Sequence, residues 1–266
     1  MTSDVTWPGF RISGIRLDAM LADEVVAQVA SFGRLRDGRT RTVCFVNAYS
    51  IVSARDDAAF SRAIDDADLS VIDGVPVAWV GRWLSGARCE RLSGPDLMHL
   101  LLSGTSYADL RHFVYGGDEE TLSRLEFRYS RGGTQNPRRI VGTWSPPFRD
   151  LTETEERTLL ARLDALQPDI LWVCLGTGRQ EKWMAAMKDR LRVPVLAGVG
   201  AAVDFLSGNK SRAPRWMQNL GLEWLFRLAT EPRRLWRRYI LGNISFIMLV
   251  VAEVFRKGRP TRGERE

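Results

Sequence analysis

Short runs of β-branched and apolar residues alternate with longer segments of helical spacing over most of this 266-residue chain. Segments with strand character occupy residues 42–47, 69–73, 111–115, 140–144, 169–175 and 193–199. Segments with helical character occupy residues 50–66, 75–84, 95–102, 118–131, 152–166, 179–188 and 201–206. Strands that alternate with helices of this length are typical of a parallel sheet, because each connection has room for a helix. The sequence therefore predicts an α/β fold with a mostly parallel, doubly wound sheet.

Polar residues and glycines follow several of the predicted strands, namely Asn47, Asp73-Gly74, Gly116-Gly117, Gly176-Thr177-Gly178 and Gly198-Val199-Gly200. Doubly wound sheets bind ligands outside the carboxyl ends of their strands, and glycine lets backbone amides approach a phosphate. The chain has no Walker lysine motif, and residues 176–178 lack the third glycine of the dinucleotide fingerprint. A nucleotide site and ordinary turns both remain open, whereas an ATPase or a dehydrogenase is not favoured.

Asp73 ends the apolar run Leu69-Ser70-Val71-Ile72 and precedes Gly74. A carboxylate at that place would project into the crevice, where it could act as a general base. The alternative is an N-cap for the next helix, because Asp is favoured at that position and Pro76 would lie in the first turn. From the residues alone, the cap is the favoured interpretation.

The composition argues against a metal site or a disulfide framework. Cys44, Cys89 and Cys174 are widely spaced and odd in number, which is typical of reduced thiols in a cytosolic protein. Only two histidines are present, and Asp66-Ala67-Asp68 falls at the end of an acidic helix, so we expect it to be solvated. Residues 1–10 lack a basic and an apolar signal region, and we expect a cytoplasmic catalytic body.

The basic character of the chain is concentrated in its last fifth. From Ser207 onward there are 13 Lys or Arg against 5 Asp or Glu, a net charge of +8, whereas residues 1–206 carry −2. At 100° per residue, the four arginines between 233 and 238 share one arc of a helix. Leu235, Trp236, Tyr239 and Ile240 fill the opposite arc. This pattern favours a helix that lies on an anionic membrane surface.

Two other interpretations of the tail remain open. It could be a solvated face of an ordinary terminal helix, or arginines and aromatic residues could bind nucleic acid. The apolar run at residues 244–252 argues against nucleic acid, and Glu253 interrupts the run before the ~20 residues that a membrane span requires. We therefore expect a monotopic anchor or a docked helix rather than a crossing. Residues 257–266 are polar, and we expect them to be disordered.

Several sequence blocks occur together in an order that is similar to one known family. They are Asn47-Ala48, residues 67–74, Glu90-Arg91-Leu92-Ser93-Gly94-Pro95-Asp96-Leu97, Gly176-Thr177-Gly178-Arg179-Gln180-Glu181-Lys182-Trp183, residues 198–205, Arg212-Ala213-Pro214, Gly221-Leu222-Glu223-Trp224, and Arg227 with Glu231-Pro232-Arg233. Together they resemble the WecG/TagA/CpsF glycosyltransferases, family 26. The resemblance covers roughly residues 42–238.

The resemblance implies a Rossmann-like, inverting and metal-independent enzyme without a cofactor, made of a catalytic domain, residues 1–212, and a membrane-associated appendage, residues 213–266. It would transfer a sugar from a UDP-sugar to a polyprenyl-diphosphate-linked saccharide at the inner face of the cell membrane, in cell-surface polysaccharide synthesis. It would bind no nucleic acid, and it could form a homo-oligomer when no membrane is present. The implied catalytic residues are Asp73, as the base, and Arg91. The implied substrate-binding residues are Asn47, Gly176, Gln180, Asp204, Arg227, Arg234 and Arg237.

Two positions depart from the family pattern. Phe45 occupies the place of a common Thr, so a polar contact near the base would be missing, and Gly178-Arg179 replaces a common Pro-Lys. Neither change alters the implied reaction class, and the donor sugar, which could be UDP-N-acetylmannosamine, a UDP-hexose or a UDP-uronate, stays open. The rival class is a non-catalytic membrane adaptor with the same fold, which would not need the acids and Arg91 in the crevice.

Overall fold

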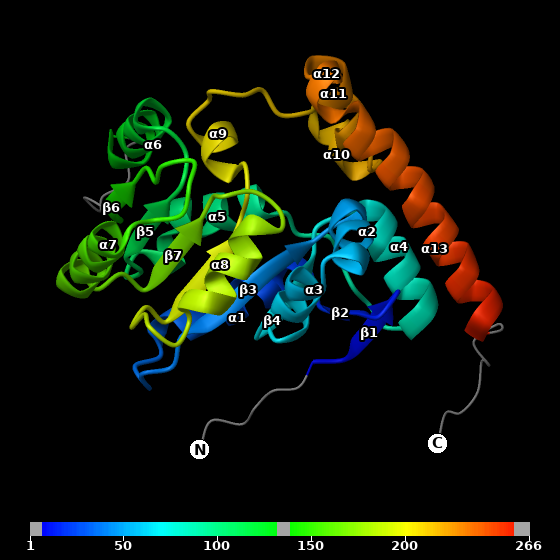
Figure 1. The fold of residues 1–266 in the computed structure, drawn as a ribbon, viewed down its shortest axis with the longest axis horizontal. Coiled ribbons are helices and arrows are strands. Elements are labelled where there is room, and N and C mark those ends of the chain that lie inside the picture. The colour runs from blue at the N-terminus through cyan, green and yellow to red at the C-terminus, as the bar shows by residue number, and fades with distance from the viewer. Residues whose placement is uncertain (1–6, 132–138, 258–266) are drawn as a thin grey trace.

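A computed structural model describes residues 7–131 and 139–257. Its main sheet has six parallel strands in the order β4-β3-β8-β7-β5-β6 (Figure 1). The strands are β3 (Arg41–Val46), β4 (Leu69–Ile72), β5 (His112–Tyr115), β6 (Ile140–Trp144), β7 (Ile170–Val173) and β8 (Val195–Gly198). Each of them lies inside or within one residue of a predicted strand. The predicted doubly wound, mostly parallel α/β fold is therefore confirmed.

Helices cover both faces of the sheet because successive strand residues point to opposite sides. One face packs on α2 (Ala48–Asp56), α3 (Ala58–Asp65), α7 (Glu153–Leu166) and α8 (Arg179–Met187) through residues such as Cys44, Val46 and Leu171. The other face packs on α1 (Ala22–Arg34), α5 (Gly94–Ser103), α6 (Glu119–Arg131) and α9 (Ala202–Leu206) through Val43, Phe45 and Trp172. The two clusters form the core of a three-layer domain.

The strand order changes direction at the centre of the sheet. The chain runs from β3 outward to β4, crosses to β5 and β6 at the far side, and returns through β7 to β8 beside β3. The carboxyl ends of β3, β4, β7 and β8 therefore meet at one edge of the sheet. Asn47, Asp73, Gly176 and Gly198 follow or end these four strands, as the sequence predicted.

The N-terminal part contains elements that the sequence pattern did not lead us to expect. Strands β1 (Gly9–Ile12) and β2 (Ile15–Asp18) form an antiparallel hairpin ahead of α1. Ser13 and Gly14 both have positive φ, 51° and 87°, which a two-residue hairpin turn requires. The Ser-Gly pair between apolar positions 10, 12, 15 and 17 was the available signal.

The prediction of one helix over residues 50–66 is wrong, because the segment forms two helices, α2 and α3. Asp57 ends α2 and begins α3, and its carboxylate accepts a hydrogen bond from the backbone N–H of Phe60 at 2.9 Å. An aspartate that caps a new helix competes with continuation of the old one. The helices α4 (Val75–Ser85) and α5 begin within one residue of the predicted starts.

The C-terminal segment follows a linker at residues 207–214 and contains α10 (Arg215–Asn219), α11 (Glu223–Thr230), α12 (Pro232–Trp236) and α13 (Gly242–Lys257). A π-helical turn, Arg237–Leu241, joins α12 to α13 without a break. Helix α13 packs on α2, and its Phe246 is buried in the core (Figure 1). Residues 215–257 of this segment lie within the predicted appendage, residues 213–266, and the division of the chain into two domains stays a prediction. Most of the predicted disordered end, residues 258–266, lies outside the described residues.

The continuous helix from Pro232 to Phe255 is longer than the apolar run in the sequence suggested. By length and composition alone it could cross a membrane, with a mean hydropathy of 1.6 and 22% of its most apolar window buried in the protein. The length argument against a crossing, based on Glu253, is therefore wrong. The docked side of α13 meets the expectation of a docked helix, while its other side is apolar and exposed.

Candidate active site

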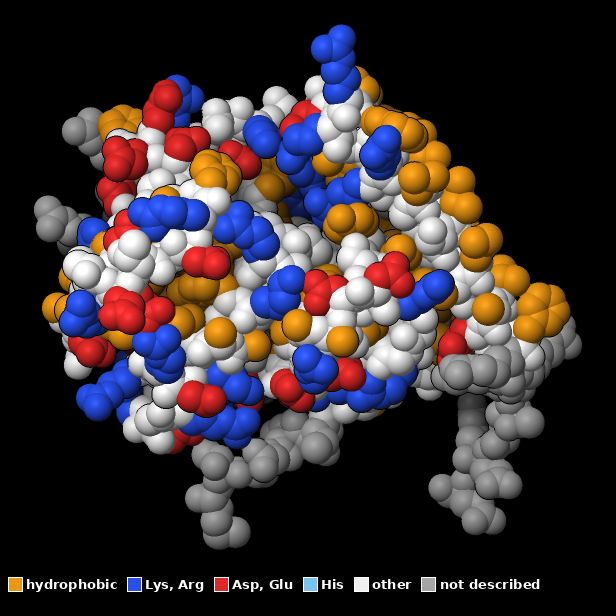
Figure 2. Space-filling view, in the orientation of Figure 1, with side chains coloured by type: hydrophobic (Ala, Val, Ile, Leu, Met, Phe, Trp, Pro, Cys, Tyr) orange, Lys and Arg blue, Asp and Glu red, His pale blue; other side chains and the backbone are white. Residues whose placement is uncertain are grey.

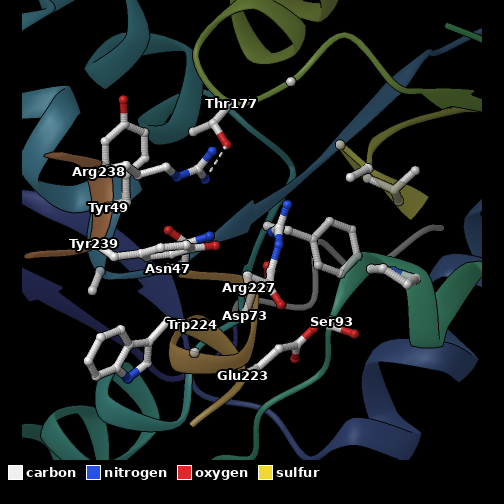
Figure 3. Close-up of a pocket in the computed structure, with 18 of the residues that line it drawn as sticks. Asn47, Tyr49, Asp73, Ser93, Thr177, Glu223, Trp224, Arg227, Arg238 and Tyr239 are labelled. Carbon is white, nitrogen blue, oxygen red and sulfur yellow. Dashed lines mark hydrogen bonds between the residues drawn. The ribbon is translucent and has the colours of Figure 1, made fainter. Parts of the chain in front are cut away.

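A cavity of about 280 Å³ lies at the carboxyl edge of the sheet, beneath the C-terminal helices (Figure 3). Asn47, Asp73, Gly176 and Gln180 line it from the sheet side, together with Arg91 and Asp204. Arg227, Arg234 and Arg238 line it from the C-terminal segment. Figure 2 shows Lys and Arg side chains in the hollow beneath α11 and α12. The structure thus brings together eight of the nine predicted site residues, all except Arg237.

Asp73 is placed by the end of β4, where its backbone N–H donates to the carbonyl of Val46 at 3.0 Å. Burial raises the pKa of its carboxyl to about 7, and the charge of Glu223 acts in the same direction, while Arg91 and Arg212 oppose the rise. A carboxylate with this pKa can accept a proton near neutral pH, since a base works best when its pKa is near the working pH.

The alternative role of Asp73 as a helix cap is wrong. The N-cap of α4 is Gly74, and no side chain accepts a hydrogen bond at that end of the helix. Asp73 therefore stands before the cap and faces the cavity, where Figure 3 shows it beside the wall formed by Asn47 and Glu223.

Arg91 belongs to a network of two cations and two anions that joins the sheet domain to α11. Its guanidinium donates to Glu223 at 2.9 Å and lies 3.9 Å from Asp96. Arg212 of the linker binds both oxygens of Asp96, at 2.5 and 2.9 Å, and donates to Ser93 at 2.9 Å. Bidentate arginine–carboxylate pairs are strong and directional. The network fixes the C-terminal segment next to Asp73.

Gln180 links the two glycine-bearing loops of the cavity. Its amide nitrogen donates to the carbonyl of Gly198 at 2.7 Å and to Glu181 at 2.9 Å, while its oxygen accepts from the N–H of Gly200 at 2.9 Å. The side chain is buried, with 3% exposed. Because its amide is engaged within the protein, this geometry supports a role in shaping the loops rather than the predicted direct contact with the donor.

The amide of Gly178, at the start of α8, is also engaged internally. The N–H of Gly178 donates to the carboxylate of Glu181 at 2.6 Å, so the anion at this helix N-terminus is a side chain of the protein. Burial raises the pKa of Glu181 to about 6. Of the predicted loop residues 176–178, Gly176 and Thr177 line the cavity, and a phosphate contact there stays a prediction.

Asn47 and Asp204 both line the cavity, and each has a local partner. The Oδ1 atom of Asn47 accepts from the N–H of Ser50 at 3.1 Å and caps α2. Asp204 lies 3.5 Å from the ammonium group of Lys210, which also lines the cavity. Both predicted binding residues are thus held in place at the wall of the cavity.

Of the three predicted arginines in the C-terminal segment, Arg227 and Arg234 line the cavity and Arg237 does not. Arg227 stacks on Phe205 at 5.4 Å, and Arg234 pairs with Glu231, 2.5 Å away. The guanidinium of Arg237 lies over the ring of Trp236. Arg238 lines the cavity instead. The reason is the π-helical turn, which has more residues per revolution than the α-helix on which the sequence argument relied.

Residues with metal-binding chemistry do not gather in the described ranges, 7–131 and 139–257, where no group of three His, Cys, Asp or Glu could hold an ion. The expectation that Asp66-Ala67-Asp68 is solvated is wrong for Asp68. Its carboxylate pairs with Arg39 at 2.5 Å and accepts from the N–H of Thr42 at 2.9 Å. The string precedes β4, so it lies about 16 Å from Asp73 along the strand.

The structure also shows the surroundings of the cysteines and of Phe45. All three cysteines are free thiols, and Cys44 is buried in the core. Phe45 is 5% exposed and lines the cavity on the same face of the sheet as its register partner Val71.

Four residues of the site, Tyr49, Arg212, Glu223 and Arg238, were not among the predicted site residues. The sequence analysis placed Arg238 only on the basic arc toward a membrane surface, whereas the structure places it at the cavity, and it gave the other three no role. Arg212 and Glu223 occur in the sequence blocks on which the resemblance rests, and that was the available signal. Tyr49 follows Asn47-Ala48, but nothing in the sequence indicates that its ring would meet a residue 189 positions later.

The fold and the cavity define a Rossmann-like α/β protein with its site at the carboxyl edge of a parallel sheet. The chain belongs to the WecG/TagA/CpsF family of glycosyl transferases, whose family model matches residues 10–260. The match confirms the resemblance and extends it to the N-terminal hairpin and to α13. Enzymes of this family are glycosyltransferases of cell-surface polysaccharide synthesis.

Proposed function

We propose that this protein is an inverting glycosyltransferase that moves a sugar from a UDP-sugar to a polyprenyl-diphosphate-linked saccharide. One observation carries the proposal: Asp73, with a pKa of about 7, lines the same cavity as Arg227, whose guanidinium has no acidic partner among the described residues. A base and an uncompensated cation are the two groups that such a transfer needs.

These groups account for every bond, electron pair and proton that moves in the transfer. The hydroxyl oxygen of the acceptor attacks the anomeric carbon of the donor, and the bond between that carbon and the β-phosphate oxygen breaks. The electron pair of the broken bond leaves with UDP, and the hydroxyl proton moves to the carboxylate of Asp73. Attack from the face opposite the leaving group inverts the anomeric centre. Arg227 and Arg234 would stabilise the charge that develops on the diphosphate.

We propose that this reaction is metal-independent, because arginines can bind diphosphate oxygens bidentately and supply the charge that a metal supplies in other transferases. The rate measured in excess EDTA should equal the rate in buffer alone. A strict requirement for added Mg²⁺ or Mn²⁺ would contradict this part of the proposal.

We further propose that the enzyme lies on the cytoplasmic face of the membrane, with the outer side of the C-terminal helix in the lipid interface. Large apolar residues on that side are exposed: Trp236, Ile240, Ile244, Ile247, Met248, Val251 and Phe255. They form an apolar stripe along the right edge of Figure 2. The opposite side packs on α2, and a helix that is docked on the protein along one side suits an interfacial position better than a crossing.

The donor can be identified with a panel of UDP-sugars in isothermal titration calorimetry and thermal unfolding. A ligand at 100 times its dissociation constant should raise the free energy of unfolding by about 2.7 kcal/mol. Binding of UDP and of at least one UDP-sugar is the expected result. A folded protein that binds neither would contradict the proposed function and would favour the non-catalytic adaptor.

A further inference from the structure

Arg238 projects from the π-helical turn to the cavity and is held there by two other elements (Figure 3). Its guanidinium carbon lies 4.2 Å from the centre of the Tyr49 ring of α2. One of its terminal nitrogens donates to the hydroxyl of Thr177, in the loop after β7, at 3.3 Å. Three segments that are distant in sequence thus converge on one cation.

Arg238 has no acidic side chain within ion-pair distance in the part of the chain that the structure describes, and the carboxyl of Glu181 acts on it only through a longer-range electrostatic interaction. Its Nε atom is buried without a hydrogen-bond partner among the same residues. A partly buried cation without an acidic partner is costly unless an anion compensates its charge. An anion in the cavity would do so.

We propose that Arg238, rather than Arg237, binds the diphosphate of the nucleotide, and that Tyr49 and Thr177 hold its guanidinium in position for this. The inference rests on the proposed function, since it assumes a nucleoside diphosphate in this cavity. A stacked guanidinium has lost much of its rotational freedom before the ligand arrives, so less entropy is lost on binding. The contact with Thr177 places the cation beside Gly176, where a side chain on the glycine would meet no other atom within 4 Å.

The test is calorimetry with UDP, UMP and uridine as probes, without membrane. Arg238→Ala should weaken UDP binding about 10- to 100-fold and leave uridine binding nearly unchanged, because only the diphosphate contact is lost. Arg238→Lys keeps the charge but loses the planar stack, so it should give an intermediate loss. Arg233→Ala, which removes an exposed arginine of the same helix outside the cavity, is the matched control.

The outcomes separate this inference from the proposed function. If the wild-type protein binds no UDP, the proposed function fails. If the wild-type protein binds UDP and Arg238→Ala binds it equally well, or if Arg237→Ala causes the loss instead, the assignment to Arg238 is overturned. A loss for UDP and uridine alike would show that Arg238 only supports the fold. If Arg238→Ala does not fold, Arg238→Lys and Tyr49→Leu, which removes the stacking ring, are measured instead. A loss of UDP affinity with unchanged uridine affinity in these variants supports the assignment, and unchanged affinity for both overturns it.

Discussion

The guanidinium of Arg91 donates a hydrogen bond to the carboxylate of Glu223 at 2.9 Å, and this contact joins the sheet domain to α11. Both side chains are mostly buried, with 16% and 23% exposed. The same carboxylate lies 3.4 Å from Arg212, and its negative charge raises the pKa of Asp73. Docking of the C-terminal segment and the acidity of the base are therefore linked through one residue.

Replacement of Glu223 tests this link. Glu223→Gln removes a negative charge that raises the pKa of Asp73, so the acid limb of the profile of kcat/KM against pH should move to lower pH. The free energy of unfolding should fall by about 1 to 3 kcal/mol, because two mostly buried arginines lose a charged partner. Glu120→Gln, in an exposed pair with Arg124, is the control and should change neither quantity. An unmoved acid limb would mean that Glu223 does not act on the base.

Asp73 should reduce stability at high pH, as residues kept for catalysis often do. Its pKa in the folded protein, about 7, is above the ordinary value of 3.8, so the folded state holds the proton more tightly than the unfolded state. The protonated carboxyl of Asp73 therefore contributes to the stability of the folded state. This contribution is complete below the ordinary pKa of 3.8 and is lost as the pH rises through 7, where the carboxyl ionises in the folded protein. Asp73→Asn, which cannot ionise, should raise the free energy of unfolding at pH 8 by on the order of 2 to 4 kcal/mol.

Urea titrations of wild type and Asp73→Asn at pH 8 and at pH 4 measure this difference. The gain should be present at pH 8 and should nearly vanish at pH 4, where the wild-type carboxyl is protonated in the folded state. Equal stability of the two proteins at pH 8 would show that the ionised carboxylate is not destabilised in the cavity.

Gln180 provides a test of loop positioning. Gln180→Ala removes bonds to the backbone of Gly198 and Gly200 and leaves buried polar groups unpaired, so the free energy of unfolding should fall by about 1 to 3 kcal/mol. UDP affinity should fall as a consequence of the loosened loop. If calorimetry shows weaker binding while denaturant titrations show full stability, Gln180 contacts the donor directly, as the resemblance implied.

The exposed face of α13 provides a test of the membrane proposal. Ile247 and Met248 are 60% and 63% exposed, so their replacement by Glu should leave the fold intact. It should lower binding to vesicles that contain phosphatidylglycerol at least about 10-fold, because charged groups replace apolar ones at the lipid interface. Leu100→Glu, at an exposed apolar position on α5, is the control. Undiminished vesicle binding would exclude this face as the contact, and resistance to alkaline extraction would indicate a crossing helix.

Much of the fold could be predicted from the sequence because each strand of the main sheet is a buried apolar run between helical patterns. The ends of those strands also placed Asn47, Asp73 and Gly176 correctly at one edge. The hairpin at residues 9–18 was missed although its turn pair, Ser13-Gly14, is visible in the sequence.

Other features depend on contacts between distant segments. The π-helical turn that brings Arg238, and not Arg237, to the cavity leaves no mark in residue spacing, because helix geometry at one turn is decided by tertiary packing. The internal use of the Gln180 amide and the contact of Glu223 with Arg91 likewise became visible only in three dimensions. The sequence thus indicated which residues lie near the site, but it did not indicate which way their side chains point.

The central claim is that Asp73 takes the proton of the acceptor hydroxyl while UDP departs. The most direct measurement is the rate of UDP release from the UDP-sugar that binds in the calorimetric panel, with a polyprenyl-diphosphate-linked acceptor, for wild type and Asp73→Asn across pH 5 to 9. We predict that the wild-type kcat/KM rises with pH and levels off above about 7, and that Asp73→Asn binds the donor but turns over roughly 10²- to 10⁴-fold more slowly without that rise. A variant with wild-type turnover and the same pH profile would contradict the account.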